Sequence, residues 1–436
     1  IAPTDFAVCF ASALLTVSFF DLCPYNTLTY DVDESVFIYI ARMMGKGFVP
    51  YRDMFDHKGP YLFFIEFIGN IGGEVGIWIM ELIFAFVTAI LMLSLTRIVT
   101  DKVLPSYLAV FGSLFVFGLY AYQGGNYAEF WALPFICASL RTIIRFFKTG
   151  EYRKRDIFLM GIDFAVVFLL RVNIAACWAA LLPIVIVSLI RKGRAVDIGK
   201  CALLFCGGIL GALIPVIIYY GMSGALGDMY ECYWKFNFEY VGEDLTVRDI
   251  CKAFIFIMRY IWPGMVILLF AAVKHIRDKV YLINLWFTAV SLVLAVISGR
   301  EYPHYGVTVI PCFVIPAAML IDDIYRANIK ISPAILKTIG ATAIIAVIAV
   351  VAKDTVLMTL GSDRSEPDIV RYIRENSDPD DDVLVVNGYG VFNLMSDRYT
   401  RQKFFYQYPL VVSDEFYASF FESIDFSKPD LIVVPE

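Results

Sequence analysis

Residues Thr29–Pro60 read TYDVDESVFIYIARMMGKGFVPYRDMFDHKGP, and this segment differs sharply from the apolar chain around it. It lies between two apolar segments and is rich in titratable side chains. These are Asp31, Asp33, Glu34, Arg42, Lys46, Arg52, Asp53, Asp56, His57 and Lys58. Charged groups beside a bilayer are costly to place, and many of them are functional. We therefore place the candidate site here.

The segment contains a helical pattern and then a loop. Apolar residues recur at spacings of three and four from Val36 to Met44, directly after Asp33 and Glu34. Glycines at positions 45 and 47 end the pattern, and Pro50 lies in the loop. The pattern predicts an amphipathic helix over about 33–46 on the membrane surface, within a first outer loop at 21–60. The polar remainder of the loop carries Lys58 back to the membrane.

The composition is that of a polytopic membrane protein. The chain has 436 residues, of which 59% are hydrophobic and 18% charged, and its mean hydropathy is +0.69. A net charge of -6 and a pI near 5.3 argue against a nucleic-acid partner. The high hydropathy makes membrane lipids the expected surroundings. Nine cysteines occur without a CxxC spacing, which gives no indication of a zinc or redox site.

About eleven membrane spans are expected from the rule that a helix needs about 20 apolar residues to cross a bilayer. The apolar run 61–71 is too short and is predicted to be a re-entrant or half-buried piece. The expected spans are 7–20, 75–99, 103–122, 127–147, two within 157–190, 198–222, 253–273, 280–298, 306–321 and 334–352.

The long apolar run 157–190 is interrupted by Arg171 and Asn173 and has basic residues at both ends. A single span would place one basic cluster on the wrong side, so we predict two short helices that meet near Arg171. We expect Arg171 to have a structural role at this apex. Because most Lys and Arg residues fall in alternate loops, the N-terminus is predicted inside and the segment 29–60 outside.

The composition changes at Lys353, which separates a transmembrane domain (1–352) from an extracytoplasmic α/β domain (353–436). Residues 368–375 have a helical pattern, and 383–386 and 431–434 are short β-branched runs typical of strands. The chain stops just after the second strand, as a truncated domain would.

Three polar sites are predicted on the outer face. They are Asp33-Glu34 with Asp56-His57-Lys58, then Gln123–Glu129, and Arg300–Tyr305. Carboxylates can deprotonate a hydroxyl, and cations can hold a phosphate. This combination at a membrane surface suggests group transfer from a lipid-linked phosphate donor.

The first outer loop resembles that of the GT-C glycosyltransferases. The relatives in question are protein O-mannosyltransferases, lipid A aminoarabinose transferases and bacterial polyprenyl-phosphate-sugar transferases of the lipopolysaccharide-core galacturonosyltransferase type. Three motifs carry the resemblance: Asp33-Glu34 at the start of the helix, Gly47-Phe-Val-Pro50-Tyr51-Arg52-Asp53, and Lys58-Gly59-Pro60. The topology over 1–352 also fits.

The resemblance implies an inverting transfer from a polyprenyl-phosphate sugar to a cell-envelope glycan, lipid or protein. Asp33 would be the general base, with Glu34 as its competitor. Lys58 and Arg300 would hold the donor phosphate, and His304 and Tyr305 would line that pocket. Asp56, His57 and Glu129 are expected at the acceptor or pocket wall. No metal or other cofactor is indicated, although a divalent metal is compatible with the fold.

Each residue also has a plain structural interpretation. Asp33 and Glu34 could favour the helix dipole, and Glu129 could cap its own helix. Lys58 could extend to lipid headgroups. Asp56 and His57 could be salt-bridge partners of Arg52. Arg300 and His304 could be headgroup anchors.

Two further classes of function remain open. A transporter or flippase of a lipid-linked glycan would place polar groups at the membrane midplane within repeated halves, whereas here they gather in outer loops. An outer-surface binding module would leave most of the spans unexplained. The favoured interpretation is an enzyme of the cytoplasmic membrane of a bacterium, with its site on the extracytoplasmic side.

Overall fold

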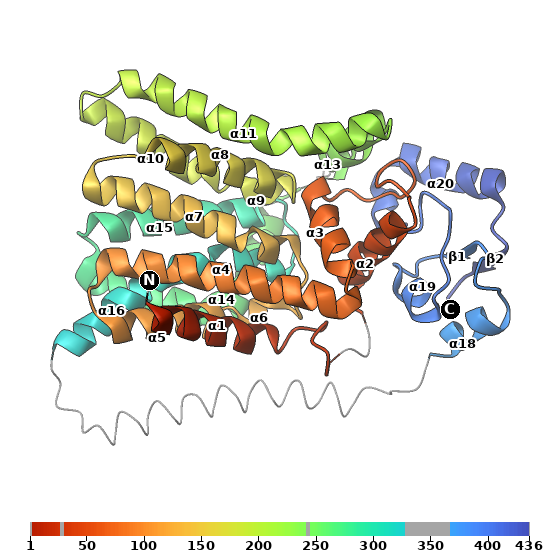
Figure 1. Ribbon diagram of the computed structural model, residues 1–436, viewed down its shortest axis with the longest axis horizontal. Coiled ribbons are helices and arrows are strands. Elements are labelled where there is room, and N and C mark those ends of the chain that lie inside the picture. The colour runs from red at the N-terminus through yellow and green to blue at the C-terminus, as the bar shows by residue number, and fades with distance from the viewer. Residues whose placement is uncertain (1, 27–29, 241–244, 328–366, 436) are drawn as a thin grey trace.

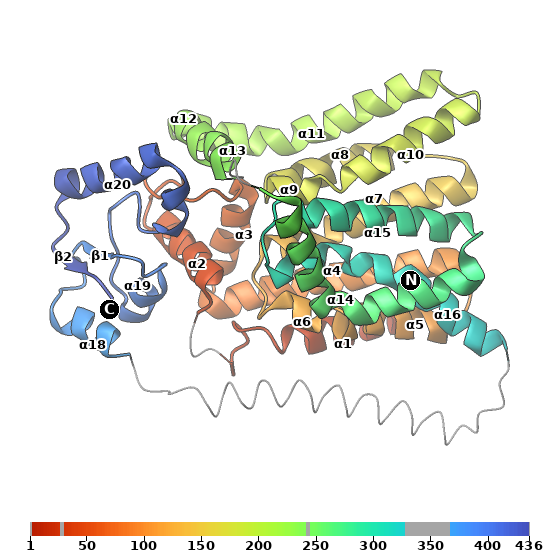
Figure 2. The same ribbon diagram turned by 180° about the vertical axis from the view of Figure 1, so that it is seen from behind.

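A bundle of long helices carries a smaller lobe at one end (Figures 1 and 2). The computed structural model describes residues 2–26, 30–240, 245–327 and 367–435. We call the end of the bundle that bears the lobe the lobe end. The long helices are α1 (Pro3–Val17), α4 (Gly73–Val99), α5 (Val103–Phe111), α7 (Ala128–Thr149), α8 (Lys154–Phe168), α10 (Trp178–Arg191), α11 (Val196–Met222), α14 (Val247–His275), α15 (Lys279–Val296) and α16 (Val314–Arg326).

Eight helical segments in the described residues are long and apolar enough to cross a membrane, as a multi-pass membrane protein requires. Three of them are composite. The segment Val172–Arg191 joins the short α9 (Val172–Ala175) to α10. The segment Val103–Tyr122 joins α5 to a π-helical turn, η1 (Gly112–Val116), and to α6 (Leu119–Tyr122). The segment Pro303–Arg326 joins the 3₁₀ helix η3 (Pro303–Phe313) to α16.

The predicted number of spans is not settled by these segments. Helices α1 and α8 have 15 residues each, which is fewer than the about 20 that a helix needs to cross a bilayer. The span expected at 334–352 lies outside the described residues. The total of about eleven therefore stays a prediction.

The hairpin predicted around Arg171 is confirmed. Helix α8 ends at Phe168, the short α9 (Val172–Ala175) comes next, and α10 runs back. At the far end, the Arg194 guanidinium donates to the carbonyl oxygen of Gly150 at 3.4 Å and lies 5.3 Å from the ring centre of Tyr152. Both basic ends of the run are therefore on the same side of the bundle.

Short helices gather at the lobe end, where the outer loops were expected. Helix α2 (Val32–Gly45) matches the helix predicted at about 33–46, and α3 (Pro60–Asn70) matches the short apolar piece. The polar loop after α11 is partly helical, with α12 (Leu226–Met229), the π-helical η2 (Tyr230–Lys235) and α13 (Phe236–Tyr240).

The lobe is a small α/β unit. It contains α18 (Asp368–Glu375), β1 (Val383–Val385), α19 (Val391–Ser396), the 3₁₀ helix η4 (Tyr408–Val412), α20 (Asp414–Ser427) and β2 (Leu431–Val433). The strands are parallel and pair Val383 with Leu431 and Val385 with Val433. Both strands and α18 lie where the sequence predicts them. The domain boundary proposed at 352/353 falls outside the described residues, so the division into domains stays a prediction.

Helix α2 packs against the lobe along one face. The Tyr39 hydroxyl donates to the carbonyl oxygen of Thr400 and accepts from its amide, both at 3.0 Å. The Tyr39 ring stacks on Phe405 with 4.0 Å between ring centres, and Arg42 donates to the Tyr399 hydroxyl at 3.0 Å. The lobe therefore supports the back of the helix that begins with Asp33.

The turn after α8 is joined to the start of α3 by two backbone hydrogen bonds. The Gly59 amide donates to Leu170 O at 2.9 Å, and the Tyr61 amide donates to Leu169 O at 3.0 Å. A Cβ at position 59 would lie 2.0 Å from Leu169 O, so only glycine permits this approach. Pro60 then starts α3 at a position where its missing amide hydrogen costs nothing.

We predict that Gly59→Ala lowers the thermal stability of the purified protein. The added methyl group meets a backbone carbonyl that cannot rotate away, and overpacking of this kind costs about 1–3 kcal/mol. The matched control is Gly199→Ala in α11, where a Cβ has nothing within 4 Å and the midpoint should stay level or rise slightly. The measurement is the unfolding midpoint in detergent. Equal midpoints for Gly59→Ala and wild type would contradict the tight contact at position 59.

Candidate active site

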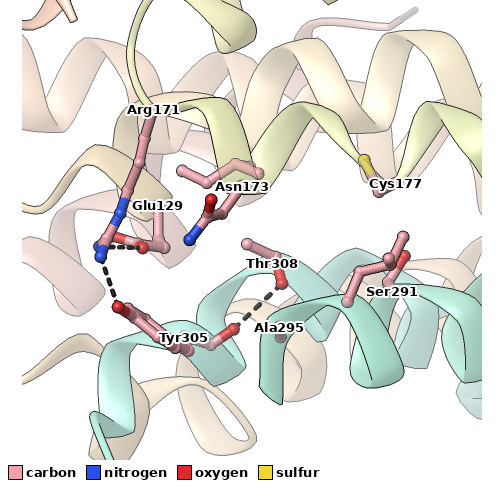
Figure 3. A pocket seen from close by; sticks show the side chains of 10 residues that line it. Glu129, Arg171, Asn173, Cys177, Ser291, Ala295, Tyr305 and Thr308 are labelled. Carbon is pink, nitrogen blue, oxygen red and sulfur yellow. Dashed lines mark hydrogen bonds and ion pairs between the residues drawn. The ribbon is translucent and has the colours of Figure 1, made fainter. Parts of the chain in front are cut away.

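Two adjoining cavities open at the junction of α3, α9, α13, α15 and η3. The first has a volume of about 500 Å³ and is lined by His57, Lys58, Arg171, Val172, Asn173, Asn237, Ser298, Arg300 and Tyr305. The second, of about 340 Å³, is lined mainly by apolar atoms (Figure 3). Its walls are Glu129, Arg171, Asn173, Ile174, Cys177, Ser291, Leu294, Ala295, Tyr305 and Thr308. The two share Arg171, Asn173 and Tyr305.

Arg171 is at the centre of this region. Its guanidinium pairs with Glu129 at 2.8 Å, donates to the Tyr305 hydroxyl, and lies 4.6 Å from the ring centre of Tyr305 (Figure 3). These contacts are compatible with the structural role expected for Arg171, and they give it partners that the sequence did not indicate. Its partners lie 42 and 134 residues away in the sequence, where no local pattern could reveal them.

Glu129 lies in the first turn of α7 and is 2% exposed. One carboxylate oxygen takes the ion pair with Arg171, and the other has no hydrogen-bond partner among the described residues. Asp33 and Lys58 are close enough to interact with it electrostatically. Its place in the first turn also fits the helix-capping interpretation, so capping and the ion pair coexist.

The Asp56 carboxylate organises the loop that carries Lys58. It accepts hydrogen bonds from the amides of His57 and, at 3.0 Å, Lys58. Burial and the nearby Asp33 raise the pKa of Asp56, while Lys58 opposes the shift. Arg52 pairs instead with Asp53, at 2.7 Å, so the idea that Asp56 and His57 are its partners is wrong.

His57 is a buried, neutral imidazole. Burial, Lys58 and Arg171 all lower its pKa well below the usual range. Its ring lies 5.6 Å from that of Phe236, and its carbonyl oxygen accepts from Asn237 at 2.7 Å. It therefore adds no positive charge to the cavity that it lines.

The two adjacent carboxylates at the start of α2 have different surroundings. Asp33 is partly exposed and lies near Asp56 and Tyr127. Burial raises the pKa of Asp56 and that of Tyr127, and the charge of Asp33 adds to both shifts. Glu34 is 2% exposed and accepts a hydrogen bond from the Asp31 amide at 3.2 Å. Burial, Asp21 and Glu81 raise the pKa of Glu34 well above its usual value. Glu34 thus caps its own helix. Asp33 lines neither of the two cavities and lies within electrostatic range of Asp56 and Glu129, so its role in the site stays a prediction.

The residues of the third predicted polar segment, Arg300–Tyr305, have different positions relative to the cavities. Arg300 and Tyr305 line the first cavity. His304 is 4% exposed and lies behind the lining, with its ring stacked on Tyr127 at 4.1 Å and its Nδ1 3.1 Å from Gln123 Oε1. It holds the segment 123–129 against η3 and touches neither cavity.

Four polar residues that line the first cavity were not predicted to be functional: Arg171, Asn173, Asn237 and Ser298. The interruption of an apolar run at Arg171-Asn173 was a usable signal. Asn237 lies in a polar stretch and has no such signal. Within the described ranges no group of three His, Cys, Asp or Glu side chains is arranged to hold a metal ion. Metal independence stays a prediction.

Comparison with known proteins places the chain in a family. Residues 3–345 match the family model described as the putative competence-induced protein Ccs4 N-terminal domain. The chain belongs to this family. No curated protein sequence matches this member of the Ccs4 N-terminal domain family significantly.

Solved structures with the same fold are membrane glycosyltransferases. The crystal structure of ArnT from Cupriavidus metallidurans in the apo state matches with a TM-score of 0.57 and 14% identity, over 92% of this chain and 86% of that one. The crystal structure of the Archaeoglobus fulgidus oligosaccharyltransferase in complex with Zn and sulfate gives a TM-score of 0.50 and 15% identity, over 90% of this chain and 62% of that one. The predicted GT-C fold is therefore confirmed for this Ccs4-type chain.

We predict that Glu34→Gln stabilises the protein relative to wild type as the pH rises. A carboxyl whose pKa is raised by folding contributes stability below its unfolded pKa, and this stability is lost as the pH rises through the folded value. Gln keeps the acceptor for the Asp31 amide and does not titrate. The difference in unfolding midpoint should grow between about pH 5 and pH 8. Glu422→Gln on the exposed face of α20 should show no such trend, and an identical pH response of both variants would refute the buried neutral state of Glu34.

Proposed function

We propose that this protein is an inverting glycosyltransferase that moves a sugar from a polyprenyl-phosphate donor to a cell-envelope acceptor. The observation that carries the proposal is the meeting of Lys58 and Arg171 in one cavity, with Asp33 within electrostatic range of Asp56 and Glu129. Membrane enzymes that use a lipid phosphate need cations at the depth of the headgroup and a base beside them.

The first cavity suits the phosphate. Lys58 is 5% exposed and Arg171 is held in a fixed orientation by Glu129 and Tyr305. A pre-oriented guanidinium presents paired N–H donors to phosphate oxygens, and an ammonium adds a compact charge. Arg300 lines the same cavity. The adjoining apolar cavity, which reaches into the bundle beside Cys177 and Leu294, suits the first carbons of the lipid.

Asp33 is the proposed general base. It removes the proton from the acceptor hydroxyl as that oxygen attacks the anomeric carbon of the sugar. The attack comes from the face opposite the phosphate, so the configuration inverts, and the electron pair of the breaking bond between the anomeric carbon and the phosphate oxygen stays on that oxygen. Polyprenyl phosphate leaves with one additional negative charge, and Lys58 and Arg171 stabilise that charge as it develops.

The distribution of cations supports a site on the extracytoplasmic side. Basic residues concentrate at the end of the bundle opposite the lobe, where Arg194 contacts Gly150 and Arg326 pairs with Asp101. The positive-inside rule assigns that end to the cytoplasm. The lobe end, with the cavities, then faces outward.

The fold agrees with this proposal. The oligosaccharyltransferase is by its name an enzyme that transfers a glycan, and a shared fold favours related chemistry without fixing the substrate. Donor, acceptor and mechanism therefore rest on the cavity residues.

We predict that Asp33→Asn abolishes transfer and leaves donor binding nearly unchanged. Asn preserves the shape of the side chain but cannot take the proton, and a positioned base contributes about 10²–10⁴-fold. Glu34→Gln should retain turnover, because Glu34 is buried away from the cavity. The measurements are turnover with a panel of polyprenyl-phosphate sugars and donor affinity. Normal turnover in Asp33→Asn would remove it as the base.

We predict that Arg171→Lys weakens donor binding and slows transfer. Lysine keeps the charge but cannot contact Glu129, Tyr305 and a phosphate at once. Loss of a charge-assisted hydrogen bond costs about 1.5–3 kcal/mol, which is roughly a tenfold to hundredfold loss of affinity. Arg277→Lys, at an exposed position between α14 and α15, is the matched control and should behave as wild type. Wild-type donor affinity in Arg171→Lys would exclude Arg171 from the phosphate site.

A further inference from the structure

The first cavity is lined by neutral polar residues as well as by cations, and we call these neutral residues the neutral wall. They are Asn237, Ser298 and Asn173, and they line the cavity together with Lys58, Arg171 and Arg300. A pocket that joins cations to uncharged hydrogen-bonding groups suits a ligand with an anionic part and a hydroxyl-bearing part.

The orientation of the Asn237 amide is fixed by its neighbours. Its Nδ2 is 2.7 Å from the carbonyl oxygen of His57 and 2.6 Å from that of Tyr233. Carbonyl oxygens only accept hydrogen bonds, so the nitrogen must face both of them. Both amide hydrogens are thereby used within the protein.

This orientation determines what Asn237 can offer to a ligand. The remaining polar atom, Oδ1, is an acceptor only, and no described residue donates a hydrogen bond to it. An ionised phosphate also has acceptors only, so the two cannot bond. A hydroxyl group can donate to Oδ1, as the hydroxyls of a sugar do.

Ser298 supplies an independent observation. Its Oγ is buried and has no hydrogen-bond partner among the described residues, although it lines the same cavity. A buried hydroxyl without a partner costs free energy unless a ligand or water satisfies it. The neutral wall therefore contains two groups that are suited to a hydroxylated ligand.

We propose that Asn237 and Ser298 form the subsite for the donor's sugar ring, with Asn237 Oδ1 accepting a hydrogen bond from a ring hydroxyl. This inference rests on the proposed function, because the cations of the same cavity would hold the donor phosphate. It assigns specificity for the transferred sugar to Asn237 in α13 and Ser298 after α15, whereas the phosphate contacts come from Lys58, Arg171 and Arg300.

The test compares two probes of equal charge. One is a polyprenyl methyl phosphodiester, and the other is a set of polyprenyl-phosphate hexoses with glucose, mannose or galactose. Their affinities are measured for the wild-type protein, Asn237→Ala, Ser298→Ala and Lys58→Ala. The methyl diester carries the phosphate without a sugar, so it also reports whether each variant still folds around the phosphate site.

Wild type should bind at least one hexose probe more tightly than the methyl diester. Asn237→Ala should lose about three- to tenfold affinity for that hexose probe, the effect of one neutral hydrogen bond, and keep its affinity for the methyl diester. Ser298→Ala should lose affinity in the same selective way. Lys58→Ala should weaken both probes alike, because it removes a phosphate contact.

Three results would overturn the subsite. Equal weakening of both probes by Asn237→Ala would mean that Asn237 acts only by holding the His57 carbonyl. Equal affinity of wild type for the methyl diester and every hexose probe would mean that the protein makes no favourable contact with the sugar. If wild type bound neither kind of probe, the donor assignment would fail, and the subsite with it.

Discussion

The site depends on two backbone hydrogen bonds that join residues 59–61 to 169–170. Residues 59–61 and residues 169–170 each belong to a segment that would otherwise be an independent turn at the membrane surface. Once joined, they bring Lys58 and Arg171 to the wall of one cavity. Two cations repel each other, so this approach needs a rigid support, and Gly59 supplies it by allowing the chains to meet without a side chain between them. Glu129 then offsets part of the charge.

Helix α2 separates two environments. Its Tyr39 and Arg42 contact the lobe, while Phe37 faces the cavity side and lies 5.5 Å from the Lys58 ammonium. Residues that are four apart share a helix face, which places Asp33 on the side of Phe37. Glu34, one residue further, is turned by about 100° into the carboxyl-rich interior near Asp21 and Glu81. Asp33 and Glu34 therefore have different surroundings, because successive side chains of a helix point in different directions.

Local patterns predicted the elements well and their long-range partners poorly. The spacing of apolar residues placed α2 within one residue, and the basic ends of 157–190 indicated the hairpin. Asp33, Lys58, Arg300 and Tyr305 could be proposed because the polar segments had to share one side of the membrane. The ion pair of Arg171 with Glu129 depends on how α7 and the turn after α8 pack, and the sequence alone does not encode that distance in any local form. The orientation of Asn237 depends likewise on the backbone carbonyl of His57, 180 residues away in the sequence, in addition to the nearby carbonyl of Tyr233.

The contact between α2 and the lobe also has a consequence for biosynthesis. The Tyr39 hydroxyl bonds to Thr400, 361 residues later, and Ser35 bonds to Tyr389, 354 residues later. During synthesis the early helices can insert one after another, but the face of α2 that carries Ser35 and Tyr39 lacks these partners until residues 389–400 have been made. The final packing of α2 is thus tied to synthesis of the lobe, and a ribosome that stops before it leaves a bundle in which α2 lacks its contacts with Tyr389 and Thr400.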